Sequence, residues 1–215
     1  MSGQSEKEAR VALADAYRRV VDLGLTELSS GNLSMRLGDG MLISPAGADR
    51  DNISEDRLVL VDRDGRWENG LKPSSEWQLH AQVYRSNPRT SAVVHTHSDN
   101  CVAVACHCRD LPPFHYLVGV FGGDNVPCVP YSTFGSDTLA KDVADALETH
   151  YACLMANHGM TACGPTLDIA ISLAHRLEIL CRQYLLAHRM GEPRHLSSED
   201  IAAFKERAGP TGYGR

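Results

Sequence analysis

The 215-residue sequence contains no run of lysine and arginine, and its formal net charge is −6. Nucleic-acid partners require a concentrated positive surface that can meet the phosphate backbone, so this charge pattern argues against them. The sequence also lacks an apolar stretch of membrane-spanning length, and its first residues are polar and charged where a signal peptide would be apolar. We therefore expect no nucleic-acid partner, no membrane association and a cytoplasmic location.

Two common nucleotide-binding motifs are missing as well, because neither G-x-x-x-x-G-K-[ST] nor G-x-G-x-x-G occurs. The seven cysteines form no C-x-x-C pair. Cys106 and Cys108 flank His107, but no second pair is present to complete a tetrahedral metal site with them. We interpret the cysteines as reduced thiols, which are common small buried residues in a reducing compartment.

The apolar residues, 43% of the chain, are sufficient for one substantial core, and no linker or internal repeat divides the sequence. We predict a single domain over residues 1–215, with flexible ends at about 1–5 and about 208–215. Helical periodicity covers residues 6–23, 137–150, 167–190 and a segment opened by Pro73-Ser74-Ser75, where Ser75 and Gln78 predict a capping box. Predicted strands cover residues 31–37, 41–43, 58–61, 92–97 and 153–160, the last broken by a turn. This order favours an α/β domain with a mostly antiparallel sheet covered by helices.

Three histidines follow β-prone segments in a way that suits a metal. His95 and His97 are separated by one residue on a predicted strand, so their side chains point to the same face. That pair alone is equally consistent with a hydrogen-bonded polar edge. His158 adds a third imidazole at a strand–turn junction, and three protein ligands with an open fourth position are typical of catalytic zinc. The other seven histidines are interpreted as ordinary; they include His80, for which we find no partner at ligand spacing.

Glu76 and three turns are candidates for the rest of a site. Glu76 opens a predicted helix, and by position alone its commoner role is to interact with the helix dipole. The turns offer hydroxyls and free backbone N–H groups of the kind that bind an anion, although each by itself is an ordinary turn. They are residues 29–32, 45–47 and 74–75.

Taken together, seven short segments spread over nearly the whole chain resemble the class II aldolase/adducin family, and most closely its L-fuculose-1-phosphate aldolase branch. The segments are SGNLS (30–34), ISPAG (43–47), PSSEW (73–77), VVHTH (93–97), HY (115–116), PYSTFG (130–135) and NHG (157–159). Thr96, between the two histidines, and Ala156-Asn157, before His158, depart from the fuculose-phosphate branch, which leaves the substrate open.

The resemblance implies a three-layer fold with a central mixed, mostly antiparallel sheet and helices on both faces. It implies a homotetramer with active sites at subunit interfaces. It implies Zn²⁺, or another divalent first-row ion such as Mn²⁺ or Co²⁺, on His95, His97, His158 and Glu76, with Glu76 also the catalytic acid/base. The phosphate pocket it implies consists of Gly31, Asn32, Ala46, Gly47, Ser74 and Ser75. Further implied residues are Tyr116 from a neighbouring subunit, Phe134 near the aldehyde, and Tyr213 in the C-terminal tail, although this tail does not align with the family's.

The expected reaction is cleavage of a ketose 1-phosphate, L-fuculose 1-phosphate or a 5-modified ribulose 1-phosphate, to dihydroxyacetone phosphate and an aldehyde through a zinc-stabilised enediolate. A Schiff-base aldolase would need a lysine in an apolar pocket, and the four lysines lie on polar segments or beside the anion-binding serines. The alternatives on the same scaffold are a pentulose-phosphate 4-epimerase, a methylthioribulose-1-phosphate dehydratase, a sugar-acid phosphate decarboxylase and a non-enzymatic adducin-like binding protein.

Overall fold

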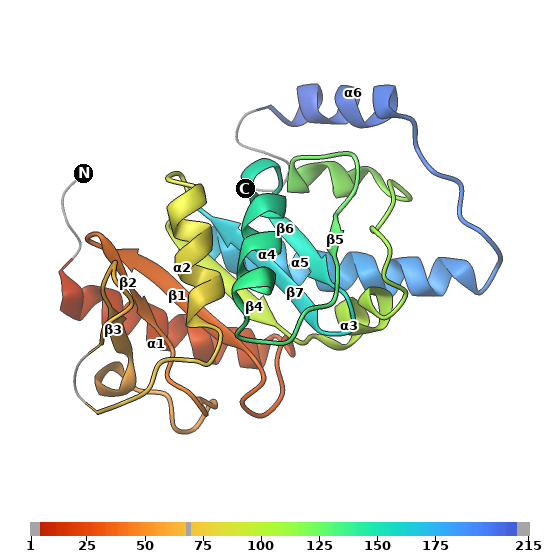
Figure 1. Cartoon of the computed structure of the whole chain (residues 1–215). Coiled ribbons are helices and arrows are strands. Elements are labelled where there is room, and N and C mark those ends of the chain that lie inside the picture. The colour runs from red at the N-terminus through yellow and green to blue at the C-terminus, as the bar shows by residue number, and fades with distance from the viewer. Residues whose placement is uncertain (1–4, 68–69, 210–215) are drawn as a thin grey trace.

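The computed structural model describes residues 5–67 and 70–209, so Tyr213 lies outside the described residues. Within them the chain builds a seven-stranded sheet in the order β3-β2-β1-β4-β7-β6-β5 (Figure 1). All neighbouring strands are antiparallel except β5 and β6, which are parallel, so the predicted mixed sheet is confirmed. The strands are β1 (Asn32–Leu37), β2 (Gly40–Ile43), β3 (Val59–Val61), β4 (Ala92–Thr96), β5 (Cys128–Val129), β6 (Ala152–Met155) and β7 (Gly159–Gly164).

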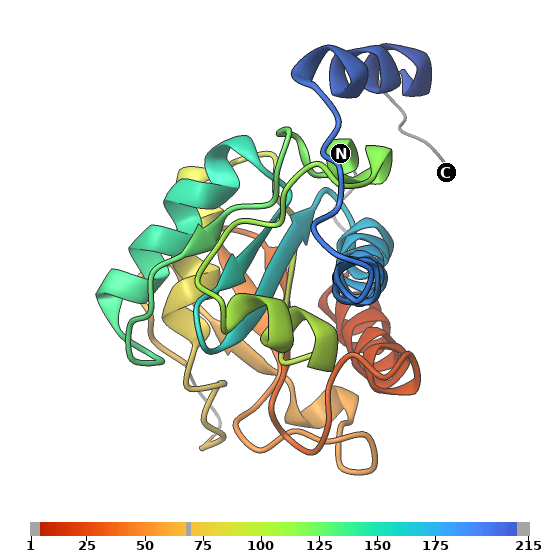
Figure 2. The ribbon, with the colours of Figure 1, turned by 90° about the vertical axis from the view of Figure 1, so that its right-hand side faces the viewer.

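Helices cover both faces of this sheet, as expected (Figure 2). Helices α2 and α4 pack on one face, whereas α1, α3 and α5 pack on the other. Helix α6 stands apart from the sheet and packs against the 3₁₀ helix η2, where Gly119 lies close to Ile201 and Phe204. The α-helices are α1 (Glu6–Asp22), α2 (Trp77–Ser86), α3 (Asp99–Ala105), α4 (Asp137–Thr149), α5 (Leu167–His188) and α6 (Ser198–Ala208), and the 3₁₀ helices are η1 (Glu55–Arg57) and η2 (Tyr116–Phe121).

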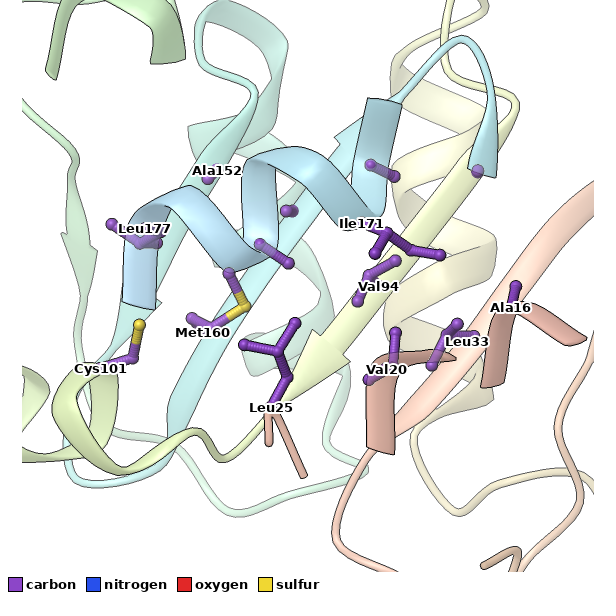
Figure 3. Packing of buried hydrophobic residues seen from close by; sticks show 14 of the residues in the cluster. Ala16, Val20, Leu25, Leu33, Val94, Cys101, Ala152, Met160, Ile171 and Leu177 are labelled. Carbon is purple, nitrogen blue, oxygen red and sulfur yellow. The ribbon is translucent and has the colours of Figure 1, made fainter. Parts of the chain in front are cut away.

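The alternation of side chains along β4 divides the core into two layers. Val94 belongs to the layer under α1, α3 and α5, where it lies beside Ile171 of α5 (Figure 3). Val93 belongs to the opposite layer, under α2 and α4. Each valine is fully buried, which contributes roughly 1.5–3 kcal/mol per side chain. Because the strand repeats every two residues, His95 must face the same layer as Val93.

The ends of the helices differ from the sequence predictions at several points. Helix α2 begins at Trp77, with Glu76 in the N-cap position and no side-chain cap hydrogen bond, so the predicted capping box at Ser75 is wrong. The first amides are organised by Ser74 instead, whose hydroxyl accepts from the backbone N–H of Glu76 at 3.3 Å. Helices α3 and α6 and strand β5 were not predicted. Ser5 caps α1 through a capping box with Glu8.

All seven cysteines are free thiols, as interpreted from the sequence. Among the described residues, no helix is both long enough and apolar enough to cross a membrane.

Candidate metal centre

Four side chains from three separate parts of the chain converge where β4 ends and β7 begins, in the middle of the sheet. Glu76 comes from the start of α2, His95 from β4, His97 from just beyond β4, and His158 from the turn between β6 and β7. Their potential ligand atoms all lie within 4.8 Å of one another. The structure thus brings together the four residues that the resemblance implies as metal ligands.

The two sheet neighbours β4 and β7 explain why His158 meets the other two histidines. Thr96 of β4 pairs with Met160 of β7, so the turn that precedes β7 lies beside the end of β4. A side chain at Gly159 would place its Cβ only 2.4 Å from the carbonyl oxygen of Thr96, so glycine is required for this approach. Asn157 adopts φ = 54°, the left-handed conformation that asparagine tolerates better than most residues.

The histidine rings lie edge to face around a common centre. The ring centroids of His95, His97 and His158 are 4.7–4.9 Å apart, with interplanar angles of 75–80°. His95 Nε2 lies 3.0 Å from both His97 Nε2 and Glu76 Oε2, and His158 Nε2 lies 3.5 Å from Glu76 Oε1. Ligand atoms on a tetrahedral zinc with bonds of about 2.0–2.1 Å would be about 3.3 Å apart. These three distances are close to that value, and the four donor atoms lie near enough to one another to surround a single small cation.

A backbone carbonyl on the side away from the cluster fixes the orientation of the His95 ring. Its Nδ1 lies 2.8 Å from the carbonyl oxygen of Met160, which can only accept, so Nδ1 carries a proton and donates it. This leaves Nε2 directed at the centre, which is the usual arrangement of a metal-binding histidine held by a backbone carbonyl.

The electrostatics of the cluster suit a cation. Glu76 is only 5% exposed, and its Oε1 has no hydrogen-bond donor among the described residues. Burial raises the pKa of Glu76, but the charges of His95 and His158 and the hydrogen bonds from His95 and Asn32 together outweigh burial, and the net pKa lies well below the ordinary value. Burial, followed by the charge of His95, lowers the pKa of both His97 and His158 to about 4. Burial opposes the charged form of His95, but the charge and hydrogen bond of Glu76 raise the pKa of His95 above its ordinary value. A divalent ion needs an ionised carboxylate and neutral imidazoles as ligands, so its binding would displace a proton from His95.

A cavity of about 460 Å³ opens beside the metal ligands. Its wall contains every residue of the predicted phosphate pocket, namely Gly31, Asn32, Ala46, Gly47, Ser74 and Ser75, and also Phe134. Three turns that are distant in the sequence therefore present hydroxyls and backbone amides to one space that also contains Glu76, His97 and His158. Each turn by itself gave no evidence of an anion site, whereas their position around one cavity favours one.

Hydrogen bonds hold the three turns together. The hydroxyl of Ser44 accepts from the backbone N–H of Leu33 at 3.1 Å, and its carbonyl accepts from the N–H of Ser74 at 3.1 Å. Ser44 is fully buried. The turn that contains Ala46 is held to the segment before Ser74 by a hydrogen bond from Ala46 N–H to the carbonyl of Lys72.

Some residues of the cavity were missed by the sequence analysis as members of a site. Tyr131, Ser132 and Asn157 line the cavity, and their positions inside two of the family-like segments were the available signal. In contrast, Tyr116 lies on η2, stacks on His115 and packs against Phe204, and it is not among the residues that line the cavity of its own chain.

Comparison with known proteins agrees with this geometry. Residues 11–185 match the family described as class II aldolase and adducin N-terminal domain. The chain is 40% identical over 196 residues to L-fuculose phosphate aldolase of Escherichia coli K12, with 91% of each chain covered. It is 40% identical over 198 residues to a 5-methylthioribulose-1-phosphate/5-deoxyribulose-1-phosphate aldolase of Rhodospirillum rubrum, with 92% of this chain and 90% of the relative covered.

A solved structure of L-fuculose 1-phosphate aldolase superimposes with a TM-score of 0.90 at 31% identity, covering 96% of this chain and 99% of the other. The family match covers residues 11–185, and the metal cluster and the cavity lie within this range. The chain therefore belongs to the class II aldolase/adducin family.

Proposed function

We propose that the protein is a zinc-dependent aldolase that cleaves a ketose 1-phosphate to dihydroxyacetone phosphate and an aldehyde. The single observation that supports this proposal most strongly is the common cavity of Glu76, two histidines and the three anion-binding turns. Such a cavity can hold a phosphate at one end and a metal-activated carbonyl at the other. The relatives whose names include fuculose phosphate, methylthioribulose 1-phosphate and deoxyribulose 1-phosphate suggest the substrate class.

The residues that would hold the metal are His95, His97 and His158, with Glu76 as a fourth ligand before substrate arrives. Zn²⁺ bound there would supply Lewis-acid stabilisation of the negative charge that develops on the ketose oxygens. Mn²⁺ and Co²⁺ suit the same donors. The orphaned Oε1 of Glu76 supports this assignment, because a buried carboxylate oxygen without a hydrogen bond needs a cation or another donor nearby.

Glu76 is the group we assign to the proton transfer. In the condensation direction it removes a C–H proton of dihydroxyacetone phosphate, and in the cleavage direction it returns that proton to the same carbon. Its low pKa keeps it ionised as the acceptor. Its position at the cavity wall, with Oε2 3.0 Å from His95 Nε2, supports this assignment.

The phosphate group is assigned to the three turns. Hydroxyls of Ser74 and Ser75 and the backbone amides of Gly31 and Gly47 are groups that donate hydrogen bonds to phosphate oxygens. Asn32 lies between this end and the metal ligands, since its amide donates to Glu76 Oε2 at 3.4 Å.

Two further roles depend on the oligomer. We propose a homotetramer in which Tyr116 of one subunit enters the cavity of a neighbour and protonates or orients the aldehyde oxygen. The place of Tyr116 outside the cavity of its own chain supports a role in another copy. Phe134, which is 63% exposed at the cavity wall, is assigned to the aldehyde side, and Tyr213 remains a predicted contributor outside the described residues.

The test is to follow release of dihydroxyacetone phosphate from L-fuculose 1-phosphate, 5-methylthioribulose 1-phosphate and 5-deoxyribulose 1-phosphate. The purified, zinc-loaded protein should release it from at least one of them, and the matching ketose without phosphate should be a poor substrate. If no ketose phosphate is cleaved, an epimerised pentulose phosphate, loss of water or loss of carbon dioxide would identify the epimerase, dehydratase or decarboxylase alternative.

A further inference from the structure

Beneath Glu76 lies a second row of polar side chains that the sequence analysis did not connect with the site. It consists of Asn32, His80, Ser34 and Tyr84, and each of these residues is 6% exposed or less. The row begins at the 3.4 Å hydrogen bond from Asn32 Nδ2 to Glu76 Oε2. It continues from Asn32 Oδ1 to His80 Nε2 at 2.6 Å, from His80 Nδ1 to Ser34 Oγ at 2.7 Å, and from Ser34 Oγ to the hydroxyl of Tyr84 at 2.8 Å.

The chemistry of these atoms allows one consistent direction. A carboxylate only accepts hydrogen bonds, so the amide of Asn32 must turn its Nδ2 to Glu76 and its Oδ1 to His80. Oδ1 cannot donate, and the proton of His80 must therefore be on Nε2. Its Nδ1 is then an acceptor, which receives the proton of Ser34 Oγ, and Ser34 Oγ in turn accepts from Tyr84.

The opposite direction of these hydrogen bonds is unfavourable at the contact between Asn32 and Glu76. If His80 carried its proton on Nδ1, Asn32 would have to rotate its amide and place Oδ1 against the carboxylate of Glu76. Two acceptors would then face each other in a buried space, where an unpaired polar group costs roughly 1–3 kcal/mol. Burial, followed by the charge of His95, lowers the pKa of His80 to about 3, so the ring is neutral and carries one N–H rather than two.

We propose that His80 is a positioning residue: through its Nε2–H it fixes the amide of Asn32 as a hydrogen-bond donor toward Glu76 and the cavity. The consequence for catalysis rests on the proposed function, whereas the direction of the row does not. The residue comes from the same helix as Glu76, one turn later, so α2 supplies both the carboxylate and the group that controls its neighbour. This accounts for a fully buried histidine that does not belong to the cluster of potential metal ligands.

The direct test is the tautomer of His80 in the metal-free protein. Long-range ¹H–¹⁵N correlation spectra distinguish an Nε2–H ring from an Nδ1–H ring, and the signals of His80 are assigned by their loss in His80→Gln. We expect the Nε2–H form at pH 7. An Nδ1–H form or a doubly protonated ring would overturn the proposal, whether or not the protein cleaves any ketose phosphate.

Three variants separate positioning from general stability. His80→Leu removes the donor, His80→Gln keeps one donor and one acceptor, and Val83→Ala weakens the same helix at a fully buried position outside the row. The first readout is Co²⁺ affinity with the visible spectrum of the bound ion, because Glu76 is one of the ligands. We expect His80→Leu to lose about 10–100-fold in Co²⁺ affinity or in kcat and to alter the Co²⁺ spectrum, as is typical of residues that orient ligands.

The matched variants determine how this result is interpreted. His80→Gln should recover most of the Co²⁺ affinity and the wild-type spectrum, and Val83→Ala should keep both while unfolding at a lower temperature. If His80→Leu and Val83→Ala behave alike once both are folded, the role of His80 is only structural. If the wild-type protein fails to cleave any substrate, the proposed function fails, but the tautomer and the Co²⁺ spectra still decide the role of His80.

Discussion

The hydroxyl of Tyr17 lies 2.7 Å from the carbonyl oxygen of Ala48 and 3.4 Å from that of Gly31. Tyr17 is fully buried on α1, on the face of the sheet opposite α2. It therefore connects this helix to Gly31, which lines the cavity, and to Ala48, which directly follows the cavity-lining turn 45–47. The hydroxyl donates its proton to Ala48, the nearer carbonyl. Packing of the first helix and placement of the anion-binding turns are therefore coupled through one side chain.

Replacing Tyr17 with phenylalanine should disturb both the packing of α1 and the placement of the anion-binding turns. Tyr17→Phe leaves the carbonyl of Ala48 without this donor, and we expect a loss of about 1 kcal/mol in the free energy of unfolding. Because Gly31 and Gly47 belong to the affected turns, KM for the phosphorylated substrate should rise several-fold with little change in kcat. Chemical denaturation and steady-state kinetics measure the two effects. Tyr151→Phe, at a 43% exposed tyrosine, is the control and should change neither; an equal loss in both variants would contradict the prediction.

The same hydroxyl predicts a pH effect at high pH. Burial, assisted by the charge of Asp49, raises the pKa of Tyr17 from 10.0 to about 12. A raised pKa in the folded state means that the protonated form is favoured by folding, so this stabilisation is complete below pH 10 and is lost as pH rises toward 12. The stability of the wild-type protein should therefore fall relative to Tyr17→Phe between pH 10 and 12. If the free energies of unfolding of the two proteins change equally with pH across this range, the prediction is contradicted.

The contrast between His95 and His80 shows what the sequence could and could not predict. His95 and His97 were recognisable because a strand places alternate residues on one face, and that rule needs only local information. His80 was interpreted as ordinary because its partners, Asn32 and Ser34, lie more than forty residues away and meet it only when β1 packs under α2. Spacing along the chain carries no signal for such a contact.

The same reasoning explains the other differences. Glu76 was ambiguous because a first-turn carboxylate usually serves the helix dipole, and only the tertiary approach of His95 and His158 shows its position in the cluster. Strand β5 consists of two residues, too few for any periodicity, and α3 spans two turns. Helix α6 did carry a sequence signal, the capping box of Ser197 and Asp200. In the structure this helix packs on η2 rather than on the sheet.

Removing the metal should lower activity and stability together. A chelator is expected to abolish cleavage, and added Zn²⁺ should restore it. An ion that binds only the folded protein also stabilises it, by about 2.7 kcal/mol when its free concentration is 100 times the Kd. Thermal unfolding with and without Zn²⁺ should therefore differ by several degrees, and His97→Ala should abolish most of this difference. Full activity in a sample that elemental analysis shows to be metal-free would contradict the mechanism.

Neutralising Glu76 should separate metal binding from proton transfer. Glu76→Gln keeps the shape of the side chain but removes the proton acceptor, and we expect kcat to fall by about 10²–10⁴-fold. The three histidines should still retain Zn²⁺, measured as metal content after dialysis, with reduced affinity. Gln78→Ala, on the same helix and in contact with Asp137 rather than with the metal cluster, is the matched control. A Glu76→Gln protein with near wild-type kcat would exclude Glu76 as the base.

The assignment of Tyr116 to a neighbouring subunit can be tested by mixing two inactive variants. Tyr116→Phe retains Glu76, and Glu76→Gln retains Tyr116, so neither homo-oligomer contains a complete site. After unfolding and refolding together in equal amounts, a site is complete wherever a subunit with Glu76 receives Tyr116 from its neighbour, and random assembly of a cyclic oligomer predicts roughly a quarter of wild-type activity. A mixture of Tyr116→Phe with the double variant is the control and should stay inactive. If the first mixture also stays inactive although hybrids form, Tyr116 acts within its own chain. If Tyr116→Phe alone is as active as the wild-type protein, Tyr116 has no role in the reaction.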